Sequence, residues 1–78
     1  MSPESALQIL ARAVTIEDTD RAEVSLALAT LESRAKTQWP FEQFRAALGS
    51  AAGDDAEKLG RRQMLNAALN AIRRALTV

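Results

Sequence analysis

The chain has 78 residues, enough for one small domain, and its ten basic residues balance ten acidic ones to a formal net charge of zero. Apolar residues make up 47% and charged residues 26%, a balance that predicts a soluble globular chain and argues against disorder. Cysteine and histidine are absent from the sequence, which excludes disulfides, thiolate–zinc sites and the commonest general base. We therefore expect a non-enzymatic domain over residues 1–78 that holds no metal and no cofactor.

The sequence also carries signals about where the protein resides. The first residues contain no basic stretch followed by an apolar one, so we expect no signal peptide. The longest apolar run, from Leu26 to Ala29, is far shorter than the ~20 residues of a membrane span. These features predict a cytoplasmic protein. Sixteen alanines, and eight arginines against two lysines, are typical of a GC-rich genome and indicate a bacterial or phage origin.

Helix-start signals and apolar periodicity predict two helices in the first half of the chain. Ser2 is a good N-cap and Pro3 suits a first helical position, which predicts a helix over residues 3–14. Asp20 and Glu23 have the spacing of a capping box and predict a second helix over residues 20–36. Apolar stripes at helical spacing support both helices: Leu7, Leu10, Ala11 and Val14 in the first, and Val24, Ala27, Leu28, Leu31 and Ala35 in the second.

Two further helices are predicted in the second half. Pro40 disfavours helix for the residue before it and suits a first helical position, so a third helix is expected over residues 40–48. The stretch from Gly49 to Gly53 is typical of a loop. Asp54 and Glu57 repeat the capping-box spacing and predict a fourth helix over residues 54–76. At 1.5 Å per residue this helix is roughly 33 Å long, and it therefore spans the whole domain.

No segment alternates apolar and polar residues over a strand length, so the predicted fold is all-α. The four helices form two helical hairpins joined at Trp39 and Pro40. A domain of this size buries only about 60–65% of its unfolded surface, and its core supplies few kcal/mol. Self-association commonly compensates for such a small core, so we expect a homodimer.

The segment 20–36 has a second face, nearly opposite its apolar stripe. Small and apolar side chains line up there at intervals of about one turn: Ala22, Leu26, Ala29 and Ser33. Such a row lets another helix approach closely. Two interpretations follow: the helix lies centrally and packs on two neighbours within one chain, or the row forms a dimer contact or a groove for a partner helix.

All the aromatic residues fall within six positions: Trp39, Phe41 and Phe44. In one interpretation the phenylalanines belong to the core and Trp39 covers the start of the third helix. In the other, Trp39 and Phe41 contribute to a contact with another protein, because tryptophan is enriched at interaction hot spots.

The C-terminal helix has a polar arc that suits nucleic acid. Arginine, asparagine and glutamine are the side chains that recognise base edges, and five of them share this arc: Arg62, Gln63, Asn66, Asn70 and Arg73. The simpler interpretation is a solvated face, because the net charge is zero and phosphate binding requires an excess of positive charge.

Two smaller features remain. The acidic stretch of Glu17, Asp18, Asp20 and Glu23 lacks the spacing and the glycine of a calcium loop, so helix capping explains it better. Arg61 falls in the apolar arc of its helix. Either the helix is irregular around Gly60, or the side chain extends to a rim or pairs across an interface.

The sequence thus predicts a small regulator, adaptor or inhibitor that acts by protein–protein contact through apolar helix faces. The alternative is a DNA-binding transcriptional regulator that uses the polar arc of the C-terminal helix. Neither function requires a membrane.

Overall fold

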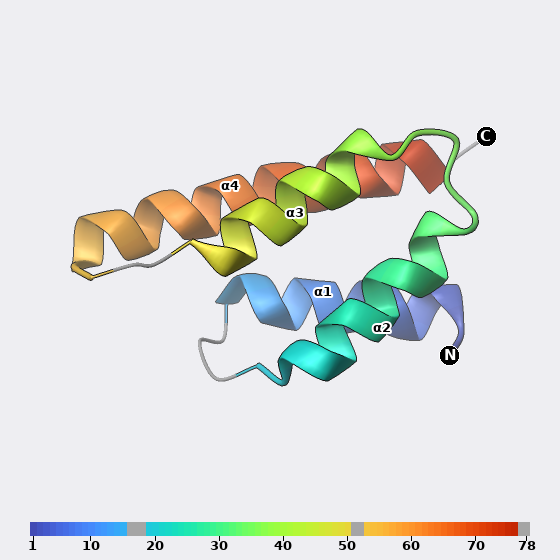
Figure 1. Ribbon diagram of the computed structural model, residues 1–78, viewed down its shortest axis with the longest axis horizontal. Coiled ribbons are helices and arrows are strands. Elements are labelled where there is room, and N and C mark those ends of the chain that lie inside the picture. The colour runs from blue at the N-terminus through green and yellow to red at the C-terminus, as the bar shows by residue number, and fades with distance from the viewer. Residues whose placement is uncertain (16–18, 51–52, 77–78) are drawn as a thin grey trace.

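A computed structural model describes residues 1–15, 19–50 and 53–76, and in these ranges the chain forms four α-helices and no strand. The helices are α1 (Pro3–Thr15), α2 (Arg21–Glu32), α3 (Trp39–Gly49) and α4 (Asp55–Leu76). Figure 1 shows them in chain order. The prediction of an all-α fold is confirmed.

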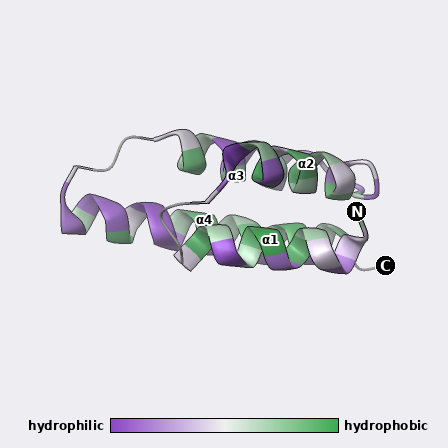
Figure 2. Cartoon of the chain, turned by 90° about the horizontal axis from the view of Figure 1, so that it is seen from below, coloured by the Kyte–Doolittle hydropathy of each residue, from purple (hydrophilic) through white to green (hydrophobic). Residues whose placement is uncertain are grey.

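The four helices pack as two hairpins. α1 packs against α2, and α3 packs against α4, as the sequence predicts. α1 also contacts α4, which joins the hairpins. In Figure 1 the two hairpins lie one above the other, and in the view turned by 90° α2 and α3 form one layer over α1 and α4 (Figure 2). The main contact between the hairpins is therefore the one between α1 and α4, while α2 and α3 each pack mainly on one partner.

Side-chain caps start α1 and α2 where the sequence predicts them. The Ser2 hydroxyl accepts a hydrogen bond from the backbone N–H of Ser5 at 3.1 Å. The Asp20 carboxylate accepts one from the N–H of Ala22 at 2.9 Å. Each cap satisfies a backbone donor in the first turn of its helix, where the chain supplies no carbonyl partner.

The cap of α4 is reciprocal. The Asp54 carboxylate accepts from the N–H of Glu57 at 2.8 Å, and the Glu57 carboxylate accepts from the N–H of Gly53 at 2.9 Å. This is the capping-box arrangement with the return bond one residue earlier than usual. It fixes the direction in which α4 starts.

α2 is shorter than predicted, because it ends at Glu32 and not at residue 36. The N–H of Arg34 bonds to the carbonyl of Leu31 at 3.0 Å, three residues back, so the last turn tightens and the helix stops. The chain then crosses to the second hairpin, and the N–H of Lys36 donates to the carbonyl of Ala75 in the last turn of α4 at 3.4 Å. This bond connects the segment after α2 to the end of α4.

The core is apolar throughout, and no polar or charged residue among the described ranges is buried. Buried apolar residues of all four helices converge in it. Its largest fully buried side chains are Phe41, Phe44, Leu10, Leu28, Leu31, Leu69 and Ile72.

α4 determines the length of the molecule. The longest dimension is 37 Å, close to the roughly 33 Å of a 22-residue helix. Figure 1 shows the first turns of α4 extending beyond the ends of α1 and α2. The bundle is therefore open at this end.

Paired substitutions of neighbouring aromatic residues test this placement of the core. Phe41→Ala should lower the free energy of unfolding by about 3–5 kcal/mol, because it removes a fully buried ring and leaves a cavity. Trp39→Ala should cost about 1 kcal/mol or less, because this ring is 55% exposed. Urea unfolding followed by circular dichroism measures both. Equal costs would contradict the assignment of Phe41 to the core and Trp39 to the surface.

Candidate protein-interaction surface and end cavity

The outer face of α2, defined here as Ala22, Leu26, Ala29 and Ser33, is exposed along its whole length. Leu26 is 56% exposed, and Leu59 and Met64 of α4 are exposed to a similar extent. Val24 and Leu28, on the other side of the helix, lie in the core. The residues that the structure describes cover α2 on that side only, so the interpretation that this row packs against two neighbours inside a single chain is wrong.

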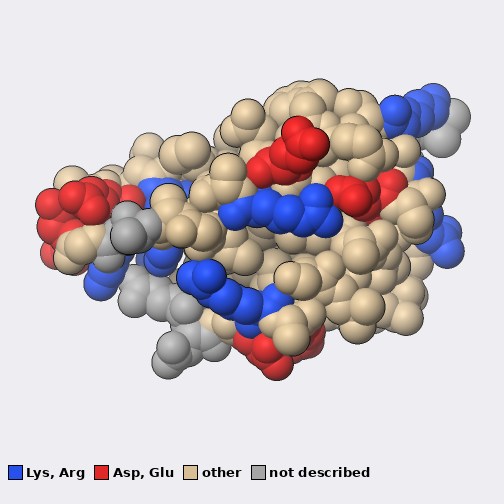
Figure 3. Space-filling view, viewed as in Figure 1, with Lys and Arg blue, Asp and Glu red and all other residues tan. Residues whose placement is uncertain are grey.

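This face also lacks charge. Between Glu23 and Glu32 α2 contains no charged residue, and Figure 3 shows an uncharged stretch of surface over the body of the helix. The central areas of protein interfaces are depleted of charged side chains in the same way. The small side chains of Ala22 and Ala29 would let the backbone of another helix come close.

Two hydroxyls on this side of α2 already have partners. The Thr30 hydroxyl donates to the carbonyl of Leu26 at 2.8 Å, and the Ser33 hydroxyl donates to the carbonyl of Thr30 at 2.9 Å. Burial of an unsatisfied hydroxyl costs free energy, and these donors are satisfied by their own helix. Covering this face therefore carries a small desolvation penalty.

Of the three aromatic residues, Trp39 lies on the surface and the two phenylalanines lie in the core. Trp39 stands at the first turn of α3, where the two hairpins are joined, and is 55% exposed. Phe41 is fully buried, so its predicted place in a contact surface is wrong. α3 begins one residue earlier than expected, and its core-facing side then includes Phe41 together with Phe44, one turn further on.

The polar arc of α4 lies on the surface. All five of its predicted nucleic-acid-binding residues are exposed: Arg62, Gln63, Asn66, Asn70 and Arg73. The Arg73 guanidinium is 3.5 Å from the amide oxygen of Asn70, at the limit of a hydrogen bond. Base recognition requires these side chains to be exposed. A solvated face that binds nothing would show the same exposure, so burial does not distinguish the two interpretations.

The Arg61 side chain extends from the apolar arc of α4 toward the end of α3. α4 is continuous through Gly60, so the interpretation of an irregular helix is wrong. The Arg61 guanidinium donates to the carbonyl of Ser50, just after α3, at 3.2 Å. It satisfies a carbonyl at the end of α3 and places positive charge at the negative end of that helix dipole.

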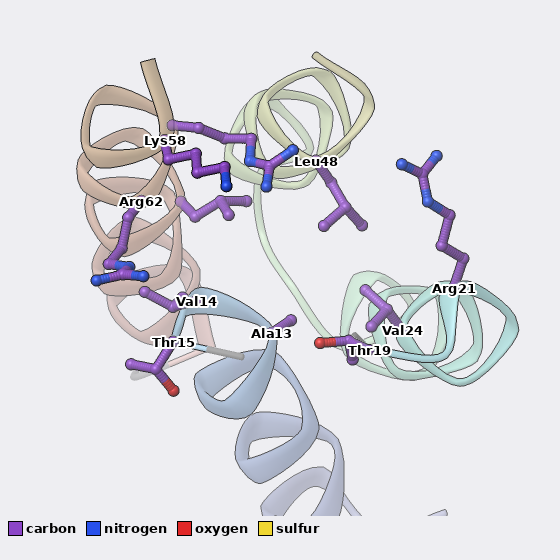
Figure 4. A pocket seen from close by; sticks show the side chains of 11 residues that line it. Ala13, Val14, Thr15, Thr19, Arg21, Val24, Leu48, Lys58 and Arg62 are labelled. Carbon is purple, nitrogen blue, oxygen red and sulfur yellow. The ribbon is translucent and has the colours of Figure 1, made fainter. Parts of the chain in front are cut away.

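A cavity of about 60 Å³, here called the end cavity, lies at the open end of the bundle. α1 ends beside it, α2 begins on one side of it, and α4 runs along the opposite side (Figure 4). Five apolar residues from all four helices line it: Ala13, Val14, Val24, Leu48 and Leu65. Thr15 and Thr19 complete the edge between α1 and α2.

Positive side chains surround this cavity. Arg21 comes from α2, and Lys58, Arg61 and Arg62 come from α4. Arg21 and Arg62 stand on opposite sides of the opening (Figure 4). The described residues that line the cavity include no carboxylate. Arg21 has no role that the sequence predicts, because only the packing of the helices brings it close to the other cations.

The remaining predictions concern metals and membranes. Asp20 caps α2, while Glu17 and Asp18 lie outside the described residues. In residues 1–15, 19–50 and 53–76, no three carboxylates gather in a way that could hold a metal ion. Within the same ranges no helix has the length and apolarity needed to cross a bilayer.

Comparisons with protein-family models, curated proteins and solved structures give no match to this chain.

Proposed function

We propose that the protein is a non-enzymatic interaction module, a small regulator, adaptor or inhibitor, that self-associates through the outer face of α2. The observation that carries the proposal is the exposed, uncharged row of Ala22, Leu26, Ala29 and Ser33 on a helix that its own chain covers on one side only. Transfer of this surface from water into a contact is the driving force, and no chemical step is required.

A second copy of the chain suits this face. Two α2 helices related by a two-fold axis would present the same row to each other, so every contact is made twice. Leu26 of each copy would lie against the small Ala22 and Ala29 side chains of the other. The formal net charge of zero means that no overall repulsion opposes the pairing.

Trp39 provides a separate contact point for a different protein. Its half-exposed ring stands at the junction of the hairpins, and tryptophan contributes strongly to binding when a partner desolvates it. In a dimer formed through α2, both copies would carry this residue. The module would then act as a divalent adaptor or inhibitor.

A charge placed in the outer face of α2 tests the proposal. Ala29→Arg should raise the dissociation constant of the dimer more than tenfold, because the contact would bury an unpaired guanidinium. The fold should survive, because position 29 is exposed in the single chain. Light scattering after gel filtration, over a tenfold dilution, measures the solution mass.

The matched control is Gln8→Arg, which adds the same charge at an exposed position of α1. This variant should keep the mass of the unmodified chain. A monomeric unmodified chain, or equal loss of association in both variants, would contradict self-association through α2.

DNA binding is the second candidate, and one observation favours it. The basic residue Arg21 of α2 joins Arg62 of α4 around the end cavity, so a neighbouring element supplies positive charge next to the polar arc. Asn66 and Arg73 are exposed further along that arc. This function would need the arc for base contacts and the cations for phosphate contacts.

A gel shift with mixed-sequence duplex DNA at low salt discriminates between the two functions. The α2 proposal predicts no retarded band at micromolar protein. A band that weakens steeply with added salt would instead support DNA binding. If base contacts are involved, Asn66→Ala should then relax sequence preference, while Gln8→Ala should leave it unchanged.

A further inference from the structure

The outer face of α2 has an edge on each side, and each edge carries one acidic and one basic residue at opposite ends of the helix. Glu23 and Arg34 are separated by about three helical turns, so they project from one edge. Arg21 and Glu32 have the same spacing on the other edge. The ion pair between Glu32 and Arg45 shows that this second edge faces α3.

The edge of Glu23 and Arg34 is open to a second molecule. Both side chains are exposed, and among the residues that the structure describes neither takes part in a side-chain hydrogen bond or ion pair. Arg34 continues the turn that ends α2, because its N–H bonds to the carbonyl of Leu31. It therefore stays close to the side of the helix that Glu23 occupies. Opposite charges at the two ends of one edge suit a copy of the same helix that runs in the opposite direction.

The size of Leu26 favours this direction. In a parallel pair related by a two-fold axis, each residue of α2 meets its own copy, so the two Leu26 side chains would hold the backbones apart. Antiparallel pairing about the middle of the outer face instead places each Leu26 opposite Ala29 of the other copy. Large side chains then face small ones, as close packing requires. The positive end of each helix dipole also lies beside the negative end of the other.

We propose that two copies of α2 pair antiparallel through their outer faces, with Glu23 of each copy bound to Arg34 of the other. In this register position 23 lies opposite position 32, and Arg34 is about 3 Å further along the axis, within reach of both long side chains. The ion pair occurs twice in the dimer and favours a second copy of this chain over an apolar helix without these charges. The arrangement rests on the self-association proposed above, and it adds the direction of the helices and the residues that determine the partner.

Reversal of both charges on one edge separates the two directions of pairing. In a parallel pair, Glu23 would meet Arg21 of the other copy, and Arg34 would meet Glu32. The double variant Glu23→Arg/Arg34→Glu restores opposite charges at both contacts of the antiparallel pair. In the parallel pair the same variant places like charges together at both contacts.

Sedimentation equilibrium at low salt measures the dissociation constant of the dimer for the unmodified chain, for Glu23→Arg, for Arg34→Glu and for the double variant. Each single variant should raise the dissociation constant at least tenfold, because two like-charged contacts appear in one dimer. The double variant should return to within about threefold of the unmodified chain. Such a recovery also excludes a folding defect, because the double variant carries both substitutions.

The matched control is Glu4→Arg, which makes the same change of charge at an exposed position in the first turn of α1. This variant should keep the dissociation constant of the unmodified chain. An equal effect of Glu4→Arg, or no effect of either single variant on α2, would overturn the ion pair.

Two further outcomes separate this arrangement from the self-association on which it rests. A dimeric unmodified chain whose double variant associates as weakly as the single variants would overturn antiparallel pairing and leave self-association in place. A monomeric unmodified chain would overturn both.

Discussion

The apolar core around Phe41 and Phe44 determines which side of each helix is buried and which stays exposed, because four helices of this size can enclose only one such core. In this arrangement each helix is covered on the inside and shows one side to water. The outer sides of α1, α3 and α4 carry charged or amide residues, such as Gln8, Glu42 and Asn66. α4 also exposes Leu59 and Met64, beside the charged and amide residues Arg62 and Gln63, whereas the outer face of α2 holds only alanine, leucine and serine. The contrast within one small bundle makes this face the leading candidate for a contact.

The contacts between the hairpins also indicate that the apolar core, and not ion pairing, stabilises the fold. The Arg45 guanidinium and the Glu32 carboxylate, 2.7 Å apart, connect α3 to α2, with side chains 44% and 30% exposed. Solvent screens such a pair, which stabilises the fold by about 1 kcal/mol or less. Stability therefore depends on the apolar core. Its modest size in a 78-residue chain gives self-association a thermodynamic reason.

Local signals in the sequence predict most of the fold. The caps at Ser2, Asp20 and Asp54 and the apolar stripes act within a few residues, so the four helices and both hairpins follow from them. Features that depend on distant contacts were missed. α2 ends early where the chain crosses to α4, and Arg21 joins the α4 cations at the end cavity. Neither feature has a signature in a single stretch of sequence. The outer face of α2 was predicted as a row, but only the packing of the helices shows that none of the described residues covers it.

The central claim is that the outer faces of two α2 helices meet, and intermolecular contacts between methyl groups report on this directly. An isotope-filtered NOE experiment, on a mixture of labelled and unlabelled chain, detects such contacts without altering the sequence. The account predicts intermolecular signals from the Leu26 methyl groups to those of Ala22 or Ala29. Intermolecular signals confined to other elements, or none at concentrations well above those used for light scattering, would contradict it.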